Sequence, residues 1–86
     1  MKLSWATTAW NEYLEWSDDK KTVKRINQLI KDIMRSPFDG IGKPEPLKGD
    51  LQGLWSRRIN EKDRVVYEVS DEEILIVACR GHYEFK

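Results

Sequence analysis

The apolar side chains of this sequence change their spacing once, and the change divides the chain into a helical half and a sheet half. Between residues 9 and 34 they recur every three or four positions, which is the spacing of helices with one buried face. From residue 51 onward they alternate with polar side chains, which is typical of half-buried strands. The segment 37–50 joins the halves and contains all 3 prolines. We therefore expect an α+β fold in which the helices come first.

The helical half predicts a hairpin of two helices behind a short edge strand at 3–5. The segment 6–8 offers a hydroxyl cap, after which the apolar spacing continues for about three helical turns. The acidic segment 17–19 interrupts this run and is expected to cap a second helix. That helix should end at 36–37, because proline lacks an amide donor and clashes with the preceding turn. The basic side chains on its other face can contact phosphate, although a charged helix face is more often only solvated.

The sheet half predicts three antiparallel strands at 54–60, 64–69 and 74–83, joined by polar turns. Pairing Ile59 with Val65 in the first hairpin places the odd-numbered side chains on one mainly apolar face. We expect the third strand to continue this face and the two helices to cover it. The covered face would include Trp55, Arg57, Tyr67, Val69, Leu75, Val77 and Cys79. The other face would stay open and carry Arg58, Arg64, Val66, Ala78, Arg80 and His82.

Length and composition indicate a single domain, 1–86, that is soluble and cytoplasmic. A chain of 86 residues suffices for one small core, and 4 tryptophans among 40% apolar residues favour a folded globule. No apolar run approaches the roughly 20 residues of a membrane span, and the first residues lack the apolar core of a signal peptide. Cys79 is the only cysteine, so we expect neither a disulfide nor a zinc site, and a thiol that is buried and inert.

The joining segment holds one carboxylate, Glu45, between Pro44 and Pro46. Each proline fixes its own φ and biases the preceding residue toward an extended backbone, so we expect the loop to hold Glu45 stiffly without a strand or helix. Such loops are usually only rigid connectors. A reactive role gains support from the open face, where arginines and the only histidine, His82, have few apolar neighbours. The same arginines can also be merely solvated, as on many antiparallel sheets.

A carboxylate and an imidazole on either side of a phosphodiester can divide the work of RNA transesterification. One takes the proton of the 2′-hydroxyl, and the other donates a proton to the departing 5′-oxygen. Guanidinium groups then stabilise the charge of the phosphorane, and Tyr83 beside His82 is an aromatic side chain that can stack on a base. This route needs no metal ion or other cofactor, and the sequence lacks the carboxylate cluster of a two-metal nuclease.

Four short motifs, in this order and spacing, resemble those of the YoeB/Txe toxins of bacterial toxin–antitoxin systems. They are Lys-Pro-Glu-Pro-Leu-Lys at 43–48, Leu-Trp-Ser-Arg-Arg-Ile at 54–59, Asp-Arg-Val-Val-Tyr at 63–67 and Cys-Arg-Gly-His-Tyr at 79–83. The resemblance implies the RelE-like fold, an antiparallel sheet with two N-terminal helices packed on one face. It also implies a metal-independent endoribonuclease that cuts mRNA in the ribosomal A site and thereby inhibits translation.

The resemblance also implies roles for single residues. Glu45 would be the general base, His82 the general acid, and Arg64 the group that holds the scissile phosphate. The residues that bind the substrate around them would be Lys48, Arg58 and Tyr83. Arg57 and Arg80 are left with structural or backbone-contacting roles. The chain departs from the family pattern in one respect, because it continues past the His-Tyr pair with the segment 84–86.

The implied partners are a cognate antitoxin of the YefM/Axe type, whose flexible segment covers the site, and a second copy of the chain in a homodimer. Operator DNA would be bound only together with the antitoxin. The alternative is a non-catalytic protein of the same fold, either a gyrase-inhibitor-like toxin or an operator-binding corepressor subunit. Glu45 would then be only a brace in its loop. Growth inhibition that survives the loss of Glu45 or His82 would identify this alternative.

Overall fold

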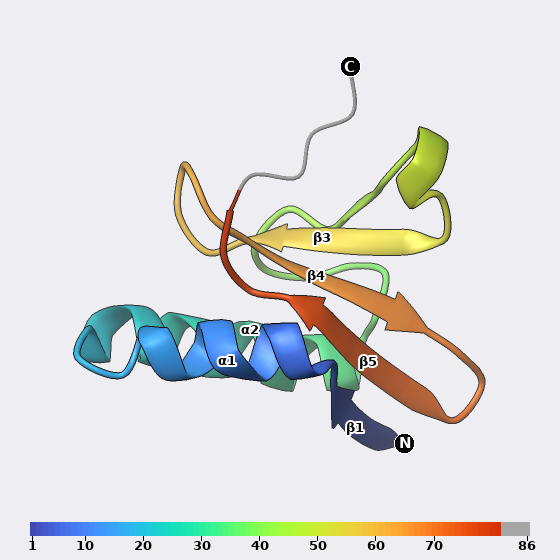
Figure 1. Ribbon diagram of the computed structural model, residues 1–86. Coiled ribbons are helices and arrows are strands. Elements are labelled where there is room, and N and C mark those ends of the chain that lie inside the picture. Colours follow the sequence, from blue (N-terminus) through green and yellow to red (C-terminus); the bar gives the residue numbers. More distant parts are fainter. Residues whose placement is uncertain (82–86) are drawn as a thin grey trace.

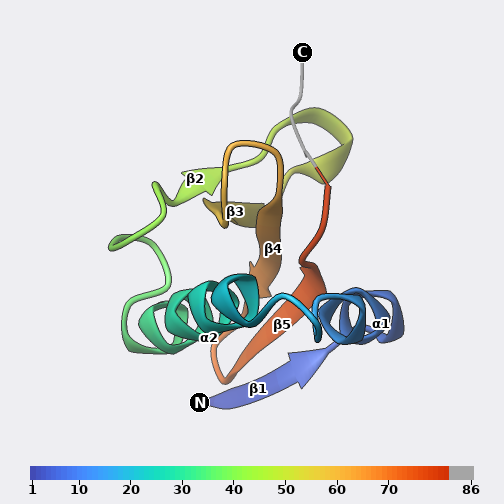
Figure 2. The ribbon, with the colours of Figure 1, turned by 90° about the vertical axis from the view of Figure 1, so that its left-hand side faces the viewer.

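Apart from a short first strand, helices precede strands along the chain, as the change of spacing predicts. The computed structural model describes residues 1–81, in which the two helices lie on one side of a single sheet (Figure 1; Figure 2). The elements are β1 (Lys2–Trp5), α1 (Thr7–Glu15), α2 (Lys20–Arg35), β2 (Glu45–Pro46), the short 3₁₀ helix η1 (Gly49–Leu51), β3 (Leu54–Arg58), β4 (Arg64–Val69) and β5 (Glu73–Ala78).

The sheet has five strands in the order β1-β5-β4-β3-β2. Neighbouring strands are antiparallel except at one edge, where β1 runs parallel to β5. The predicted edge strand at 3–5 is thus confirmed, but the sheet is mixed rather than wholly antiparallel. A parallel pair needs a long connection between its strands, and here both helices and the other three strands lie between β1 and β5 in the sequence.

The second helix begins and ends where the sequence predicts, and the first does not begin as expected. Asp19 caps α2, because its carboxylate accepts hydrogen bonds from the amide and the hydroxyl of Thr22 at 3.0 and 2.8 Å. At α1 the cap residue is Ala6 and no side chain caps the helix, so the predicted hydroxyl cap is wrong. The amide of Ala6 instead donates to the carbonyl of Ile76 at 2.9 Å, so the chain enters α1 directly from its bond to β5.

The core lies between the helices and the sheet. The buried face of α2 carries Ile26, Leu29, Ile30 and Ile33. Burying each such side chain stabilises a fold by about 1.5–3 kcal/mol relative to leaving it in water. Cys79 joins this cluster, which confirms the predicted buried cysteine, and burial raises the pKa of its thiol to about 12. No helix among residues 1–81 is long and apolar enough to cross a membrane.

The hairpin of β3 and β4 is shifted by two residues from the predicted pairing. Val65 lies opposite Arg57 and not opposite Ile59. The cause is the turn, because the side chain of Asn60 accepts hydrogen bonds from the amides of Lys62 and Asp63 and closes the hairpin one residue earlier than expected at each end. A shift by two residues does not change which face a side chain occupies, so the odd-numbered residues of both strands still face the helices.

The side chains of residues 74–77 in β5 lie on the opposite faces from those predicted, whereas Ala78 packs with Val66 on the face away from the helices, as predicted. Ile74 and Ile76 are fully buried on the helical side, where they lie opposite Val69 and Tyr67. The expected inward orientation of Leu75 and Val77 is therefore wrong. A register shift between Val66 and Tyr67 then pairs Val66 with Ala78, so that even-numbered residues of the two strands lie opposite each other at this end. Such bulges insert one residue into one strand, and an unbroken apolar run such as Ile74–Ala78 fits either face equally well.

A second, smaller cluster covers part of the face that was expected to be open. Leu47 packs there against Val66 and Ala78, which are only 1% and 3% exposed. Leu51, Leu54 and Val77 pack around these three side chains. The segment after β2 therefore folds over this face, and Arg58 and Arg64 lie on the part of it toward the β3–β4 turn.

Arg57 is a structural residue, as predicted, and it is fully buried on the helical side. Its guanidinium donates to the Asp32 carboxylate at 2.5 Å and to the Tyr67 hydroxyl at 3.2 Å. It also donates to three backbone carbonyls, those of Ser36, Asp39 and Ile41. One side chain thus fixes the end of α2 and the segment 36–41 to the sheet. Because that segment leads into β2, Arg57 also helps to fix the position of Glu45.

The pKa of Asp32 gives the fold a defined pH dependence. Hydrogen bonds from Arg35, Arg57 and the amide of Ile41 hold the pKa of the Asp32 carboxyl at about 2, below its usual 3.8. A carboxylate whose pKa is lowered by folding stabilises the fold above its unfolded-state pKa. For Asp32 this contribution is lost as the pH falls from about 4 to about 2.

We expect Asp32→Asn to lower the free energy of unfolding at neutral pH, because the amide cannot replace the charge beside Arg57. The difference between variant and wild type should shrink as the pH falls from about 4 to about 2. Urea unfolding at a series of pH values checks this. Asp71→Asn, in an exposed turn, serves as the control and should change little. A difference between Asp32→Asn and wild type that is constant across this range would contradict the assignment.

Candidate active site

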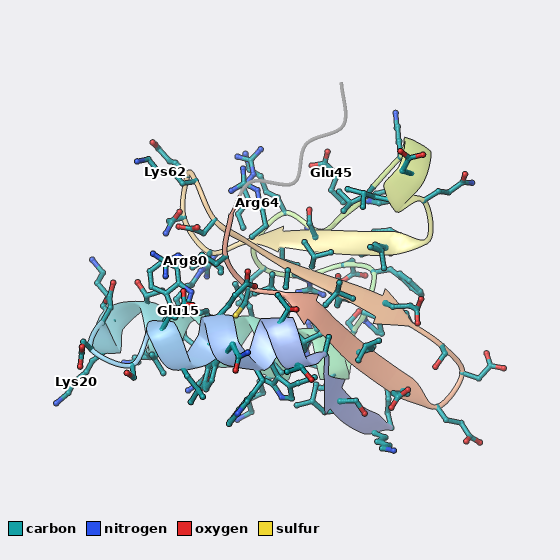
Figure 3. The ribbon with its side chains drawn as sticks, in the orientation of Figure 1. Glu15, Lys20, Glu45, Lys62, Arg64 and Arg80 are labelled. Atoms are coloured by element: carbon teal, nitrogen blue, oxygen red, sulfur yellow. The ribbon has the colours of Figure 1, made fainter. Side chains whose placement is uncertain are left out.

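Glu45 and the two arginines Arg58 and Arg64 share the face of the sheet that is turned away from the helices. Glu45 lies opposite Ser56 across β2 and β3, and Ser56 lies opposite Val66 across β3 and β4. Arg58 lies directly opposite Arg64. Because side chains opposite each other point to the same side of a sheet, all of them project from the face that the helices do not cover. Figure 3 shows Glu45 and Arg64 projecting on that side.

The position of Glu45 depends on strand pairing as well as on the prolines. Glu45 and Pro46 form β2, which pairs with β3, so the expectation that the loop holds the carboxylate without a strand is wrong. On one side of β2 the amide of Leu47 donates to the carbonyl of Leu54 at 2.9 Å, and the Leu47 side chain is buried. On the other side the amide of Arg58 donates to the carbonyl of Gly42 at 2.7 Å. The segment is therefore tied to β3 at both ends, while Glu45 stays exposed.

Arg58 and Arg64 form a positive site that has no acidic partner among residues 1–81. The salt bridges in this part of the chain involve Lys2, Arg35, Arg57 and Arg80, and neither Arg58 nor Arg64. Two like charges placed directly opposite each other on a sheet destabilise it. Two guanidinium groups in this arrangement can bind one phosphate through several charge-assisted hydrogen bonds. The pairing is thus unfavourable for the fold alone and favourable for binding an anion.

The β3–β4 turn fixes the direction of the Arg64 side chain. Nη1 of Arg64 donates to the carbonyls of Asn60 and Asp63 at 2.8 and 3.1 Å. The residue is 8% exposed, and among residues 1–81 no acceptor takes the hydrogen bonds of Nε or Nη2. One corner of the guanidinium is therefore held by the turn, and no group of residues 1–81 occupies the donors that face away from it.

The separation of Glu45 and Arg64 suits a ligand that lies between them. Glu45 is two strands from Val66, and Arg64 is two residues along β4 from Val66. With strands about 4.8 Å apart and a rise of about 3.4 Å per residue, the Cα atoms of Glu45 and Arg64 lie about 12 Å apart. Both side chains are long, so a carboxylate and a guanidinium at this separation can contact one phosphodiester group from two sides.

The other candidate residues fall into three groups. Lys48 is exposed just before η1, at the end of the segment that carries Glu45. Arg80 does not join the open face, because its guanidinium bonds to Glu15 at 2.6 Å and lies 5.1 Å from the Trp16 ring (Figure 3). This agrees with a structural role for Arg80 but corrects its expected place beside Arg64. His82 and Tyr83 lie outside the residues that the structure describes, so their predicted roles stay predictions.

Asn60 and Asp63 contribute to the site and were not singled out from the sequence. Their carbonyls orient Arg64, and the Asn60 side chain shapes the turn. The signal was present, because an asparagine that opens a four-residue polar segment is typical of a turn closed by its own side chain. Among residues 1–81 no three histidine, cysteine, aspartate or glutamate side chains are placed to hold a metal ion.

Sequence comparisons place the chain near one group of bacterial toxins. Residues 5–83 match the family model described as the YoeB-like toxin of bacterial type II toxin–antitoxin systems. The chain is 58% identical over 84 residues to toxin YoeB of Escherichia coli strain K12, which covers 96% of this chain and 100% of the relative. It is 55% identical over 85 residues to toxin YoeB of Synechocystis, which covers 98% of this chain and 99% of the relative.

Solved structures that are similar to this chain also include YoeB toxins. A YoeB/ParE toxin from Agrobacterium tumefaciens superposes with a TM-score of 0.92 at 48% identity, covering 96% of this chain and 100% of the other. A YoeB dimer from Staphylococcus aureus superposes with a TM-score of 0.89 at 45% identity, covering 96% and 98%. YoeB in the heterotetrameric YoeB–YefM complex of the same species gives 0.87 over the same shares. YafQ from Escherichia coli, at 11% identity and a TM-score of 0.80, shares the fold.

Proposed function

This chain belongs to the YoeB family of toxins of bacterial type II toxin–antitoxin systems, and we propose that it is an endoribonuclease that cuts mRNA in the ribosomal A site. Cleavage there would stop translation. The observation that carries the proposal is the pair Arg58 and Arg64, which lie directly opposite each other without an acidic partner in residues 1–81, on the face that also bears Glu45. A phosphodiester of RNA supplies the negative charge that this pair lacks.

The proposed reaction is attack of a ribose 2′-oxygen on the adjacent phosphorus. Glu45 takes the proton of the 2′-hydroxyl as the new oxygen–phosphorus bond forms, and His82 gives a proton to the 5′-oxygen as its bond to phosphorus breaks. The products are one RNA end with a 2′,3′-cyclic phosphate and another with a 5′-hydroxyl. All atoms and protons of the step are supplied by the substrate and by these two side chains, so the proposed route uses no metal ion or other cofactor.

The cations are proposed to act on the charge that develops during the reaction. Arg64 would hold the scissile phosphate with the donors that the β3–β4 turn leaves free, and Arg58 would share the charge of the phosphorane. Lys48 would add positive charge from the segment that carries Glu45, and Tyr83 would pack against a nucleotide. A group that stabilises a developing charge in this way is often worth about 3–4 kcal/mol of the activation barrier.

The proposed partners follow from what the relatives assemble with. In Staphylococcus aureus, YoeB is found as a dimer and in a heterotetrameric complex with YefM. We propose that this chain likewise forms a homodimer, and that it binds a YefM-like antitoxin whose flexible segment covers the face with Arg58 and Arg64. An acidic segment that orders on binding would suit that basic face. Operator DNA would be bound only by the toxin and antitoxin together.

The test of the proposed function is cleavage by the purified protein. It is added to ribosomes that carry a defined mRNA with an open A site, and the new RNA ends are mapped and their chemistry determined. We expect cuts confined to the A-site codon, with 2′,3′-cyclic phosphate and 5′-hydroxyl ends. The buffer contains no divalent ions beyond those that the ribosome needs. A 5′-phosphate end would contradict attack by the 2′-hydroxyl.

The non-catalytic alternative makes the opposite prediction in cells. If the chain acts only by binding, in the manner of a gyrase inhibitor or a corepressor subunit, growth inhibition should survive replacement of Glu45 or His82. Expression of each variant with and without the antitoxin separates the two proposals. Two arginines without an acidic partner in residues 1–81 suit either function by themselves, whereas a carboxylate held on the same face favours the catalytic one.

A further inference from the structure

The segment Cys79–Gly81, which follows β5, is held to the rest of the protein from both sides. It is not part of a strand, yet Cys79 is fully buried and the neighbouring backbone groups are hydrogen-bonded. Most backbone groups of a surface segment bond to water instead, so each of these bonds restricts the path of the chain. The segment also directly precedes His82, the proposed general acid.

On one side the segment is held by α1. The amide of Cys79 donates to the Glu12 carboxylate at 2.9 Å, and the indole of Trp16 donates to the Cys79 carbonyl at 3.0 Å. The ion pair between Arg80 and Glu15 lies beside these bonds. Both polar groups of the Cys79 backbone are thus satisfied by side chains of the first helical region, so the chain leaves β5 in a fixed direction.

On the other side the segment is held by the β3–β4 turn through Asp63. Oδ1 of Asp63 accepts a hydrogen bond from the amide of Gly81 at 2.8 Å, and Oδ2 accepts one from the side chain of Asn60 at 3.2 Å. The carbonyl of Gly81 accepts from the amide of Arg64 at 3.0 Å. The carbonyl of Asp63 accepts from Nη1 of Arg64 at 3.1 Å. Asp63 therefore contacts both the guanidinium that is proposed to hold the phosphate and the residue before the proposed general acid.

We propose that Asp63 is a positioning residue that fixes the phosphate-binding arginine and the segment leading to the general acid relative to each other. The proposal rests on the proposed function for its effect on catalysis, although the contact itself does not. Asp63 touches neither the substrate nor the reacting atoms in this mechanism. Its side chain joins Gly81 to the turn and its backbone joins Arg64 to the same turn, so one residue sets the place of Arg64 relative to Gly81, the residue that precedes the proposed general acid.

The test compares Asp63→Ala with Asp63→Asn and with Glu61→Ala. Alanine removes the acceptor of the Gly81 amide, asparagine keeps an oxygen there without the charge, and Glu61 is an exposed carboxylate in the same turn. Asp63→Ala should lower kcat by about 10- to 100-fold with little change in KM, because a misplacement of about 1 Å can cost that much. Asp63→Asn should stay within about threefold of wild type, since it retains the hydrogen bond. Glu61→Ala should behave as wild type.

Hydrogen exchange of the Gly81 amide provides a readout that does not depend on activity. Protection should be lost in Asp63→Ala and kept in Asp63→Asn and Glu61→Ala, with thermal unfolding used to show that all three variants are folded.

Lost protection with unchanged kcat would overturn the positioning role and leave the proposed function intact. Equal loss of kcat in Asp63→Ala and Asp63→Asn would also overturn it, because the charge and not the hydrogen bond would then matter. A wild-type protein that cuts no mRNA would instead overturn the proposed function, and unchanged protection in Asp63→Ala would refute the contact.

Discussion

Glu45→Gln should lower the rate of mRNA cleavage on programmed ribosomes by about 10² to 10⁴, the usual contribution of one general base. Glutamine keeps the size of the side chain and its ability to accept a hydrogen bond, but it cannot take a proton from the 2′-hydroxyl. Glu45 is exposed and its backbone is held by β3, so the substitution should leave the fold unchanged. The loss should therefore appear in kcat, while binding to the ribosome and to the antitoxin is retained.

Glu68→Gln is the matched control for this experiment. Glu68 is an exposed glutamate of β4 that lies opposite Leu54, on the same face of the sheet as Glu45 but at the other end of the strand. It changes the charge of that face by the same amount at a place remote from Arg64. We expect Glu68→Gln to cleave at the wild-type rate. Cleavage by Glu45→Gln within about threefold of wild type would exclude Glu45 as the general base.

Replacement of Arg57 by methionine should have the largest effect on stability. Removing one partner of a buried, hydrogen-bonded charge pair costs about 3–5 kcal/mol, because the groups left behind lose their partner and water reaches some of them only in part. In this case three backbone carbonyls and the Asp32 carboxylate lose a donor. A chain of 86 residues has a total free energy of unfolding of about 4–13 kcal/mol, so the substitution should remove from about a quarter to all of that stability.

Urea unfolding at 25 °C measures this effect, and Arg58→Met is its control. Arg58 is the next residue of the same strand, but its side chain is exposed and lies opposite a second arginine. Removing it should change the free energy of unfolding by no more than about 0.5 kcal/mol, with a small gain from the lost repulsion. A loss of less than about 1 kcal/mol in Arg57→Met would show that the segment 36–41 is held to the sheet by other contacts.

The sequence correctly predicted that Arg57 faces the helices and that Arg58 lies on the open face, and the structure explains why the two arginines differ. Alternation places neighbouring residues on opposite faces, so one of the pair had to meet the helices and the other the open side. Which contacts Arg57 makes could not be foreseen, because its partners come from α2 and from the segment 36–41, which carry no periodic signal toward it. Arg58 was expected on the open face, and its pairing with Arg64 places it there.

Errors arose where a single residue changes the register. The expected pairing of Ile59 with Val65 failed because the Asn60 side chain closes the turn earlier, and the inward placement of Leu75 and Val77 failed because a bulge shifts β5. Both are local choices that alternation leaves open, since an apolar run fits either face. The wrong pairing of Ile59 with Val65 did not change the predicted site, because a shift by two residues keeps each side chain on the same face of the sheet.

By itself the sequence determined the α+β architecture, the helical hairpin at the start, the buried face of α2 and the shared face of Arg58 and Arg64. These properties depend on periodicity and parity, which are properties of neighbours along the chain. The tertiary structure alone decided that β2 supports Glu45, that Leu47 covers part of the open face, that Arg80 pairs with Glu15, and that Asp63 holds Gly81. Each of these joins residues that are distant along the chain or separated by a turn, and no local spacing encodes which of the available partners a side chain reaches.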